Sequence, residues 1–114
     1  MKKIVRGDIF YADLDSFVDI EEKRIVPVLI IQNNISNLNG KTTIIAPILT
    51  RKDNYNKEPT HIEIKQFEKI RPKSIIVLDK ISVIDRNSLK GYLGTLDEED
   101  MREVDKLLRL TLDV

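Results

Sequence analysis

The longest apolar run in the chain sets the strongest limit on its fold. It extends from Ile25 to Ile31 and contains Pro27. With Arg24 and Gln32 at its ends, it predicts a strand that is apolar on both faces, which is typical of a strand inside a sheet. Proline has no N–H for a neighbouring strand, so Pro27 marks either a bulge or the entry of this strand. The run is far shorter than the roughly 20 residues that a membrane-spanning helix needs.

Four further segments predict strands from their β-branched content or from alternation of apolar and polar residues. They cover residues 9–14, 42–49, 60–65 and 74–84. Between the strands at 24–32 and 42–49, Asn39-Gly40 favours the tight primed turn of a β-hairpin. After the last strand, Asp85 predicts the cap of a short turn that reaches Leu89.

The chain is predicted to end in an amphipathic helix. Asp97 is the expected N-cap, and the acidic residues 98–100 occupy the first turn, where the helix dipole favours anions. The apolar face comprises Met101, Val104, Leu108 and Thr111, widened by Leu107 and Leu112. Five strands followed by this helix predict a mainly β fold with a C-terminal α-helix: a curved antiparallel sheet with the helix packed on it. Small barrels of this kind bind ligands through loops at one rim.

Length and composition limit the possible functions. The 114 residues predict a single domain over 1–114. The 19 basic and 19 acidic side chains balance, so there is no strongly basic overall field to attract nucleic acid, although a local patch is compatible with this balance. The chain has no cysteine, which excludes thiolate metal sites and a cysteine nucleophile. The N-terminus becomes charged before a signal-peptide core can develop, so we expect a soluble, cytoplasmic protein without membrane attachment.

Several common catalytic arrangements are missing from the sequence. His61 is the only histidine and has no nucleophile motif around it, so its expected role is structural. The four glycines form no phosphate-binding loop, and no His, Asp and Glu cluster has the spacing of metal ligands. The sequence therefore predicts neither a metal site nor a cofactor.

Two polar loops remain as the places where chemistry could occur. The first, at 15–23, holds Glu21 and Phe17 and leads into Arg24, and the second, at 50–59, holds Thr50 and Arg51. Cationic donors beside a hydroxyl suit metal-free RNA cleavage, in which a ribose 2′-OH attacks its own phosphodiester. Composition leaves open the simpler interpretation that these are solvated loop charges.

In their order, several segments resemble the MazF/PemK family of toxin endoribonucleases from toxin–antitoxin pairs, from about Arg6 to Leu112. This resemblance implies an SH3-like barrel of the MazF/PemK/CcdB type that works as a homodimer and cuts single-stranded RNA selectively without a metal. It also implies a cognate antitoxin, with DNA binding only through the antitoxin complex. The segments that carry the resemblance are RGDIFYADL at 6–14, PVLIIQN at 27–33, PTHIEI at 59–64, and SIIVLDKI at 74–81 with Ile84-Asp85.

The family pattern around its key arginine is Gly-x-Glu-x-Gly-x-x-Arg-Pro. In this chain Glu21 and Pro27 match it, both glycines are missing, and Val26 occupies the place of the arginine. Since residues two apart on a strand face the same side, Arg24 is the candidate replacement, displaced by roughly 6.5–7 Å. The threonine of the family matches Thr50, so the resemblance predicts Thr50 and Arg24 as catalytic residues. Ser82 stands where the family has a second arginine.

Other residues are candidates for RNA contacts. Asp79 and Lys80 match positions where the family contacts bases, although both could be outward members of an alternating strand. Phe17 could stack on a base or be tucked into the rim of the barrel. Glu21 and Arg51 complete the predicted RNA-binding set.

Two alternatives remain open at this stage. One is a protein of the same fold that binds RNA or antitoxin but does not cut, because valine supplies no charge to a phosphate. The other is a toxin that acts on a gyrase-like protein, as in the related CcdB branch. In that case function would reside in the C-terminal helix, at residues such as Leu107 and Arg109.

Overall fold

The computed structural model describes residues 2–14, 25–64 and 67–114. The apolar run forms strand β2 (Ile25–Ile30), which lies between β1 (Asp8–Asp13) and β3 (Thr42–Thr50). This confirms the prediction of an inner strand. Pro27 pairs opposite Tyr11 without a register shift, and pairing with β3 begins one residue later, at Val28↔Pro47. Pro27 therefore marks the entry into the β2–β3 ladder rather than a bulge.

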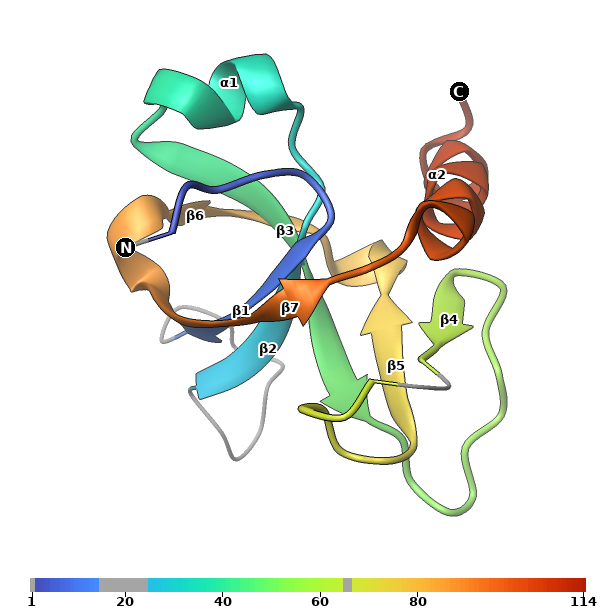
Figure 1. The fold of residues 1–114 in the computed structure, drawn as a ribbon. Helices are drawn as coiled ribbons and strands as arrows, with labels where there is room; N and C mark the ends of the chain where they lie inside the picture. Colours follow the sequence, from blue (N-terminus) through green and yellow to red (C-terminus); the bar gives the residue numbers. More distant parts are fainter. Residues whose placement is uncertain (1, 15–24, 65–66) are drawn as a thin grey trace.

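All neighbouring strands are antiparallel, and β3 is the strand that joins the two parts of the sheet (Figure 1). Its first half pairs with β6 at Thr42–Ile45, and its last three residues pair with β5. The order is β4-β5-β3-β2-β1-β7, with β6 beside β3. The remaining strands are β4 (His61–Glu63), β5 (Ser74–Val77), β6 (Ser82–Asp85) and β7 (Leu89–Thr95).

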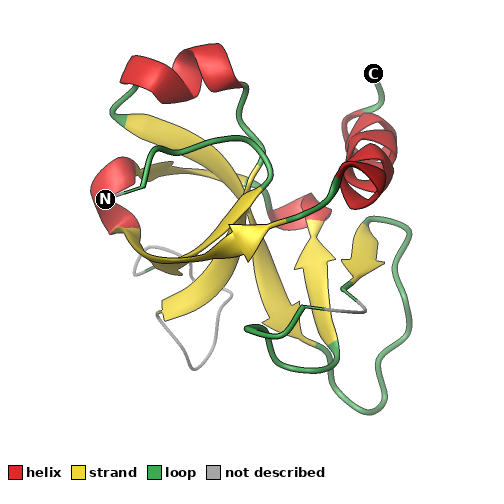
Figure 2. Ribbon diagram, viewed as in Figure 1, coloured by secondary structure: helices red, strands yellow, loops and turns green. Residues whose placement is uncertain are grey.

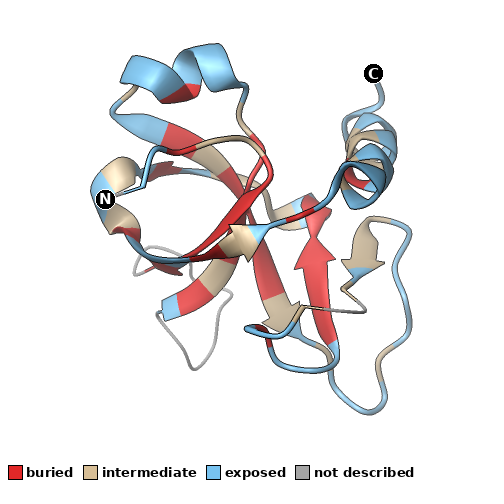
Figure 3. Cartoon of the chain, viewed as in Figure 1, coloured by how far each residue is buried: buried red, intermediate tan, exposed pale blue. Residues whose placement is uncertain are grey.

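The inner strands consist largely of buried residues (Figure 3). Their side chains belong to two apolar clusters, one on each face. Along β2, Leu29 belongs to one cluster while Val28 and Ile30 belong to the other. The second cluster is lined by β1, β2, β3, β6 and β7 and contains Phe10, Val26, Ile45, Ile84 and Leu89. The first cluster is covered by the C-terminal helix. Alternation along a strand thus explains why the longest apolar run has no polar face.

The C-terminal helix is α2 (Glu98–Leu112), and it packs beside β4 and the 3₁₀ turn that follows β5 (Figure 1). The predicted cap is confirmed, because the Asp97 side chain accepts a hydrogen bond from the Asp100 N–H at 2.8 Å. Val104 is fully buried on the predicted apolar face, whereas Leu112 is exposed. Burial, followed by repulsion from the Asp97 and Glu99 carboxylates, raises the pKa of Asp100. No helix among the described residues is long and apolar enough to cross a membrane.

The hairpin turn predicted at Asn39-Gly40 is wrong. A short helix, α1 (Asn34–Asn39), connects β2 to β3 (Figure 2). Asn33 caps it by accepting from the Ser36 N–H at 2.8 Å. Asn37 is buried, where it donates to the Gln32 carbonyl and accepts from the Thr43 hydroxyl. A single buried asparagine with hydrogen-bond partners on both sides therefore outweighs the local preference for a turn.

The strand predicted over 74–84 is interrupted. Ser74–Val77 and Ser82–Asp85 both pair along one edge of β3, but the 3₁₀ turn η1 (Leu78–Lys80) separates them. From Ile76↔Ile48 to Ser82↔Ile45, six residues of this segment pass three of β3, so the extra residues leave the ladder. Asp79 and Lys80 accordingly lie on a turn and are not members of an alternating strand.

Within the described ranges the sheet has seven strands, and the last of them, β7, was not among the five predicted. The turn predicted after Asp85 is confirmed as η2 (Arg86–Ser88), with Asp85 accepting from the Asn87 N–H at 2.7 Å. Glycine at 91 and 94 weakens the strand signal of β7. Gly94 is required by the fold, because its φ is +153° and a side chain there would meet the Phe67 ring.

Candidate active site

Thr50 is the last residue of β3 and lies exposed at the rim of the sheet. It pairs with Ser74 of β5, and the next backbone N–H, that of Arg51, donates to the Lys73 carbonyl at 2.8 Å. Two residues earlier, Ile48 is buried, so the same face of β3 changes from core to solvent at Thr50. The threonine hydroxyl is therefore presented to solvent from a backbone that is held by the ladder, as a reactive site requires.

Arg51 follows Thr50 directly but is directed across the sheet. Its Nε lies 3.9 Å from Glu63 Oε1 on β4, and its side chain is 29% exposed. Opposing residues of a ladder share a face, so Leu49, Ile75 and Glu63 point to one side with Arg51. The Nε is buried and makes no hydrogen bond within the part of the chain that the structure describes. Thr50 and Arg51 are therefore adjacent in the chain but point to opposite faces, and the guanidinium is paired loosely to an acid.

Val26 occupies the apolar interior. It is 5% exposed, pairs opposite Ala12 and belongs to the second apolar cluster. It lies at the same end of the sheet as Thr50, because antiparallel β2 begins where β3 ends. The place of the family arginine is therefore a core position in this chain. The other candidates on this side, Phe17, Glu21 and Arg24, lie outside the described residues.

Ser82 lies away from the rim. It begins β6 opposite Ile45, and Thr50 is five residues further along β3, which corresponds to about 17 Å of strand. A serine side chain cannot span that distance. Within one chain, the two positions at which the family has arginines therefore offer no charge to Thr50.

Asp79 is joined to a network around the single histidine. His61 Nε2 lies 3.1 Å from Asp79 Oδ1, and His61 Nδ1 lies 2.7 Å from the Tyr55 hydroxyl. The rings of Tyr55 and His61 stack at 14°, and the Glu58 N–H donates to the Tyr55 oxygen. Both ring nitrogens of His61 are thus partnered. These contacts connect the loop after Thr50, through Tyr55, to η1, through Asp79.

Asp79 and Lys80 form a separate part of the surface from Thr50. Asp79 is exposed and Lys80 is half-buried, and both lie on η1 between the β5 and β6 pairings. Since His61 pairs with Val77, this region is three residues along β5 from the Ser74–Thr50 pair. The predicted RNA contacts therefore divide into a rim group and an η1 group.

Two features of the site were missed by the sequence analysis. Tyr55 was not singled out, although it is the only aromatic residue in the loop at 50–59. The cationic run Lys69-Ile70-Arg71-Pro72-Lys73 was also missed, although three basic residues in five are a visible signal. No group of His, Asp or Glu residues that could hold a metal ion occurs among the described residues.

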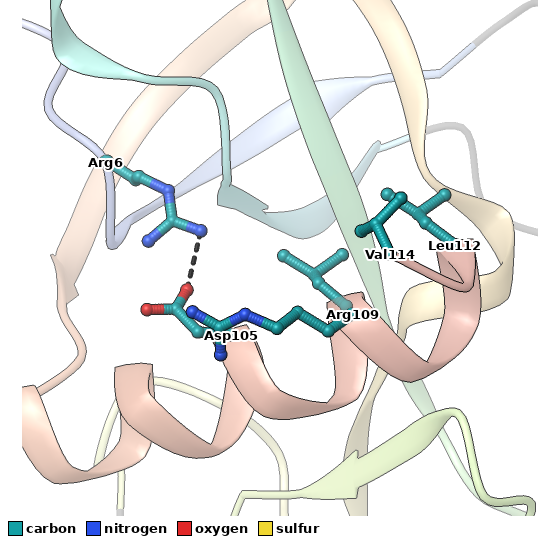
Figure 4. Close-up of a pocket in the computed structure, with 6 residues that line it drawn as sticks. Arg6, Asp105, Arg109, Leu112 and Val114 are labelled. Carbon is teal, nitrogen blue, oxygen red and sulfur yellow. Dashed lines mark hydrogen bonds and ion pairs between the residues drawn. The ribbon is translucent and has the colours of Figure 1, made fainter.

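A groove of about 330 Å³ lies between α2 and the N-terminal segment (Figure 4). Arg6 Nη2 pairs with Asp105 Oδ1 at 2.7 Å on its wall, and Arg109 projects beside them. Leu107 does not line it. Of the two helix residues considered for a protein-directed toxin, only Arg109 therefore faces this groove.

The solved structures that superpose on this fold include members of a class of bacterial toxins. MazF from Deinococcus radiodurans superposes with a TM-score of 0.80 at 15% identity, and each chain covers 100% of the other. A mycobacterial endoribonuclease, solved in complex with its cognate antitoxin, has a TM-score of 0.78 at 19% identity, covering 97% of this chain and 96% of its own. These likenesses establish the fold, including the SH3-like barrel type that the sequence predicted.

The sequence places the chain within that class. The family model described as "PemK-like, MazF-like toxin of type II toxin-antitoxin system" matches residues 5–112, so the chain belongs to this family. A relative from Staphylococcus saprophyticus, named Endoribonuclease MazF, is 39% identical over 108 residues, which is 94% of this chain and 89% of the relative.

Proposed function

We propose that this protein is the toxin of a toxin–antitoxin pair and cleaves single-stranded RNA selectively without a metal. The observation that carries the proposal is Thr50, an exposed hydroxyl fixed at the rim of a family fold. The name of the 39% identical relative, Endoribonuclease MazF, supports the same reaction.

In the proposed reaction a ribose 2′-oxygen forms a bond to the adjacent phosphorus while the bond from phosphorus to the 5′-oxygen breaks. The 2′-OH loses its proton, the leaving 5′-oxygen gains one, and a 2′,3′-cyclic phosphate remains. Thr50 would hydrogen-bond to the phosphate or the 2′-OH and position the two reacting atoms. Charge on the phosphate oxygens needs a cationic donor, for which Arg24 is the candidate, and Arg51 is proposed as an RNA contact.

We propose the remaining RNA contacts at Phe17, Glu21, Asp79 and Lys80. Asp79 and Lys80 would read bases beyond the cut site, since they lie on η1 rather than at the rim. A homodimer and a cognate antitoxin complete the proposal. The mycobacterial relative solved with its cognate antitoxin supports the second of these partners.

Val26 favours a second candidate, a protein of the same fold that binds RNA or antitoxin without cutting. A guanidinium at this position would strengthen its bonds to phosphate as negative charge develops, and a buried valine supplies none. The two candidates make the same prediction for binding and opposite predictions for cleavage.

The deciding experiment is a cleavage assay on a long single-stranded RNA with excess EDTA. Purified protein without antitoxin is compared with Thr50→Ala. Discrete cuts that end in cyclic phosphate, made by the wild type only, are expected. Binding in a gel shift without cuts would replace the endoribonuclease with the non-cleaving binder. Absence of both would direct attention to Arg109 and a protein target.

A further inference from the structure

The turn that enters β5 carries cations beside Thr50. We call Arg51, Lys52, Lys69, Arg71 and Lys73 the basic edge. These residues come from the two loops that meet at the Thr50–Ser74 pair, at the lower end of β3 and β5 in Figure 1. Their acidic neighbours are Asp53, Glu63 and Glu68, so the edge has an excess of two positive charges in a chain whose net charge is zero.

Most of these cations are available to a ligand. Lys52, Lys69 and Arg71 are exposed and make no ion pair with the described residues. Lys73 pairs with Asp53 at 3.1 Å, but the two side chains are 52% and 96% exposed, so water screens that pair strongly. A phosphate that approaches the edge can therefore compete for the ammonium group.

The backbone of the turn is fixed in an unusual conformation. Lys73 has a φ of 65°, which non-glycine residues adopt rarely. Its carbonyl accepts the Arg51 N–H at 2.8 Å, and the Ser74 hydroxyl donates to the Arg71 carbonyl at 2.6 Å. These bonds hold Arg71 and Lys73 at set positions next to Thr50. A cost in backbone energy at a site is a reason to look for a function there.

We infer that the basic edge binds the phosphate backbone of RNA beside Thr50, with Arg71 and Lys73 as positioning residues. The RNA would then be held by phosphate contacts on the β5 side of Thr50. On the β2 side, the buried Val26 supplies no charge. Phosphate contacts fix the register of a nucleic acid without reading its sequence. This inference rests on the proposed function, because it names the path of the RNA at that site.

The test measures how affinity for a 2′-O-methyl oligoribonucleotide depends on salt. This probe has no free 2′-OH, so binding is measured without cleavage. Arg71→Gln with Lys73→Asn removes both charges, and asparagine tolerates a positive φ. Single-stranded contacts contribute about 0.7 each to the slope of log affinity against log salt. We expect the magnitude of this slope to be about 1.4 smaller in the double variant, and its binding at 0.15 M salt to be about tenfold weaker.

The matched control is Arg102→Gln with Lys106→Gln, which removes two exposed charges from α2. Its slope should equal that of the wild type. An Arg71/Lys73 variant with the same salt slope as the control variant would overturn the inference. That outcome would not change the conclusion of the RNA cleavage assay about the proposed endoribonuclease. Wild type that binds through the edge but does not cut RNA would support the inference and contradict the endoribonuclease. A wild type that does not bind the probe would overturn the inference.

Discussion

The two sides of Thr50 differ in chemistry although both lie at the same end of the sheet. On the β2 side, Val26 is buried in an apolar cluster with Phe10 and Ala12. On the β5 side, Arg71 and Lys73 are exposed on a turn that is hydrogen-bonded to Arg51. The family fold is therefore compatible with an apolar residue at the β2 position and with cations on the β5 turn. In this chain the β2 position lies in the apolar core, and the β5 turn carries exposed cations.

The largest effect is expected on the rate of RNA cleavage when Thr50, which lies between the β2 side and the β5 side, is replaced. Thr50→Val keeps the shape and β-branching of the side chain and removes only the hydroxyl. Loss of one positioned hydrogen-bonding group costs about 10²–10³ in rate, so we expect that reduction in RNA cleavage. Thr50→Ser, which restores the hydroxyl, should keep most of the activity. Equal rates for the valine and serine variants would show that the hydroxyl takes no part.

The β2 side is tested by replacing the buried valine with the family residue. Val26→Arg introduces a charge among apolar side chains without a partner, and we expect the free energy of unfolding to fall by about 3 kcal/mol in urea denaturation. The control is Ile25→Arg at the neighbouring position, which is 52% exposed and should change stability by under about 0.5 kcal/mol. A stable Val26→Arg protein with increased cleavage would mean that the β2 side can still serve the site.

The β5 side depends on the loop that Tyr55 fastens to His61. Tyr55→Phe removes the 2.7 Å hydrogen bond and leaves the stacked ring, so unfolding should become easier by about 1 kcal/mol. Tyr11→Phe removes a partly exposed hydroxyl as a control, and its effect should be close to zero. If both variants unfold alike, the network does not hold the loop.

The smallest effect is expected for Lys73→Asn, at the positive-φ position of the basic edge. Lys73→Asn introduces a residue type that tolerates φ near 65°, so the free energy of unfolding should stay within about 0.5 kcal/mol of wild type. Lys73→Val should lose about 1–2 kcal/mol, because a β-branched residue resists this conformation. Calorimetric unfolding of Lys73→Asn, Lys73→Val and wild type measures these differences in stability. Equal stability would show that Lys73 relaxes out of the positive-φ region at little cost.

Local signals predicted much of the fold. The apolar run at 25–31 predicted an inner strand, and Asp97 and Asp85 predicted the caps that the structure contains. These features depend on neighbours in the sequence, which is why a single chain is enough to find them. Asn39-Gly40 misled the prediction because the buried Asn37 finds hydrogen-bond partners on both sides. The segment at 74–84 misled it because β3 is too short for every residue of that segment to pair.

The sequence by itself determined the family, since the match rests on the order and spacing of short segments along the chain, and the same spacing made Thr50 a candidate. Only the tertiary structure decided that Val26 belongs to the core, that Asp79 faces His61, and that Lys73 lies across the ladder from Arg51. The physical reason is that burial and charge placement depend on contacts between segments far apart in the sequence. The strand register sets those contacts, and the composition of a single segment does not reveal it.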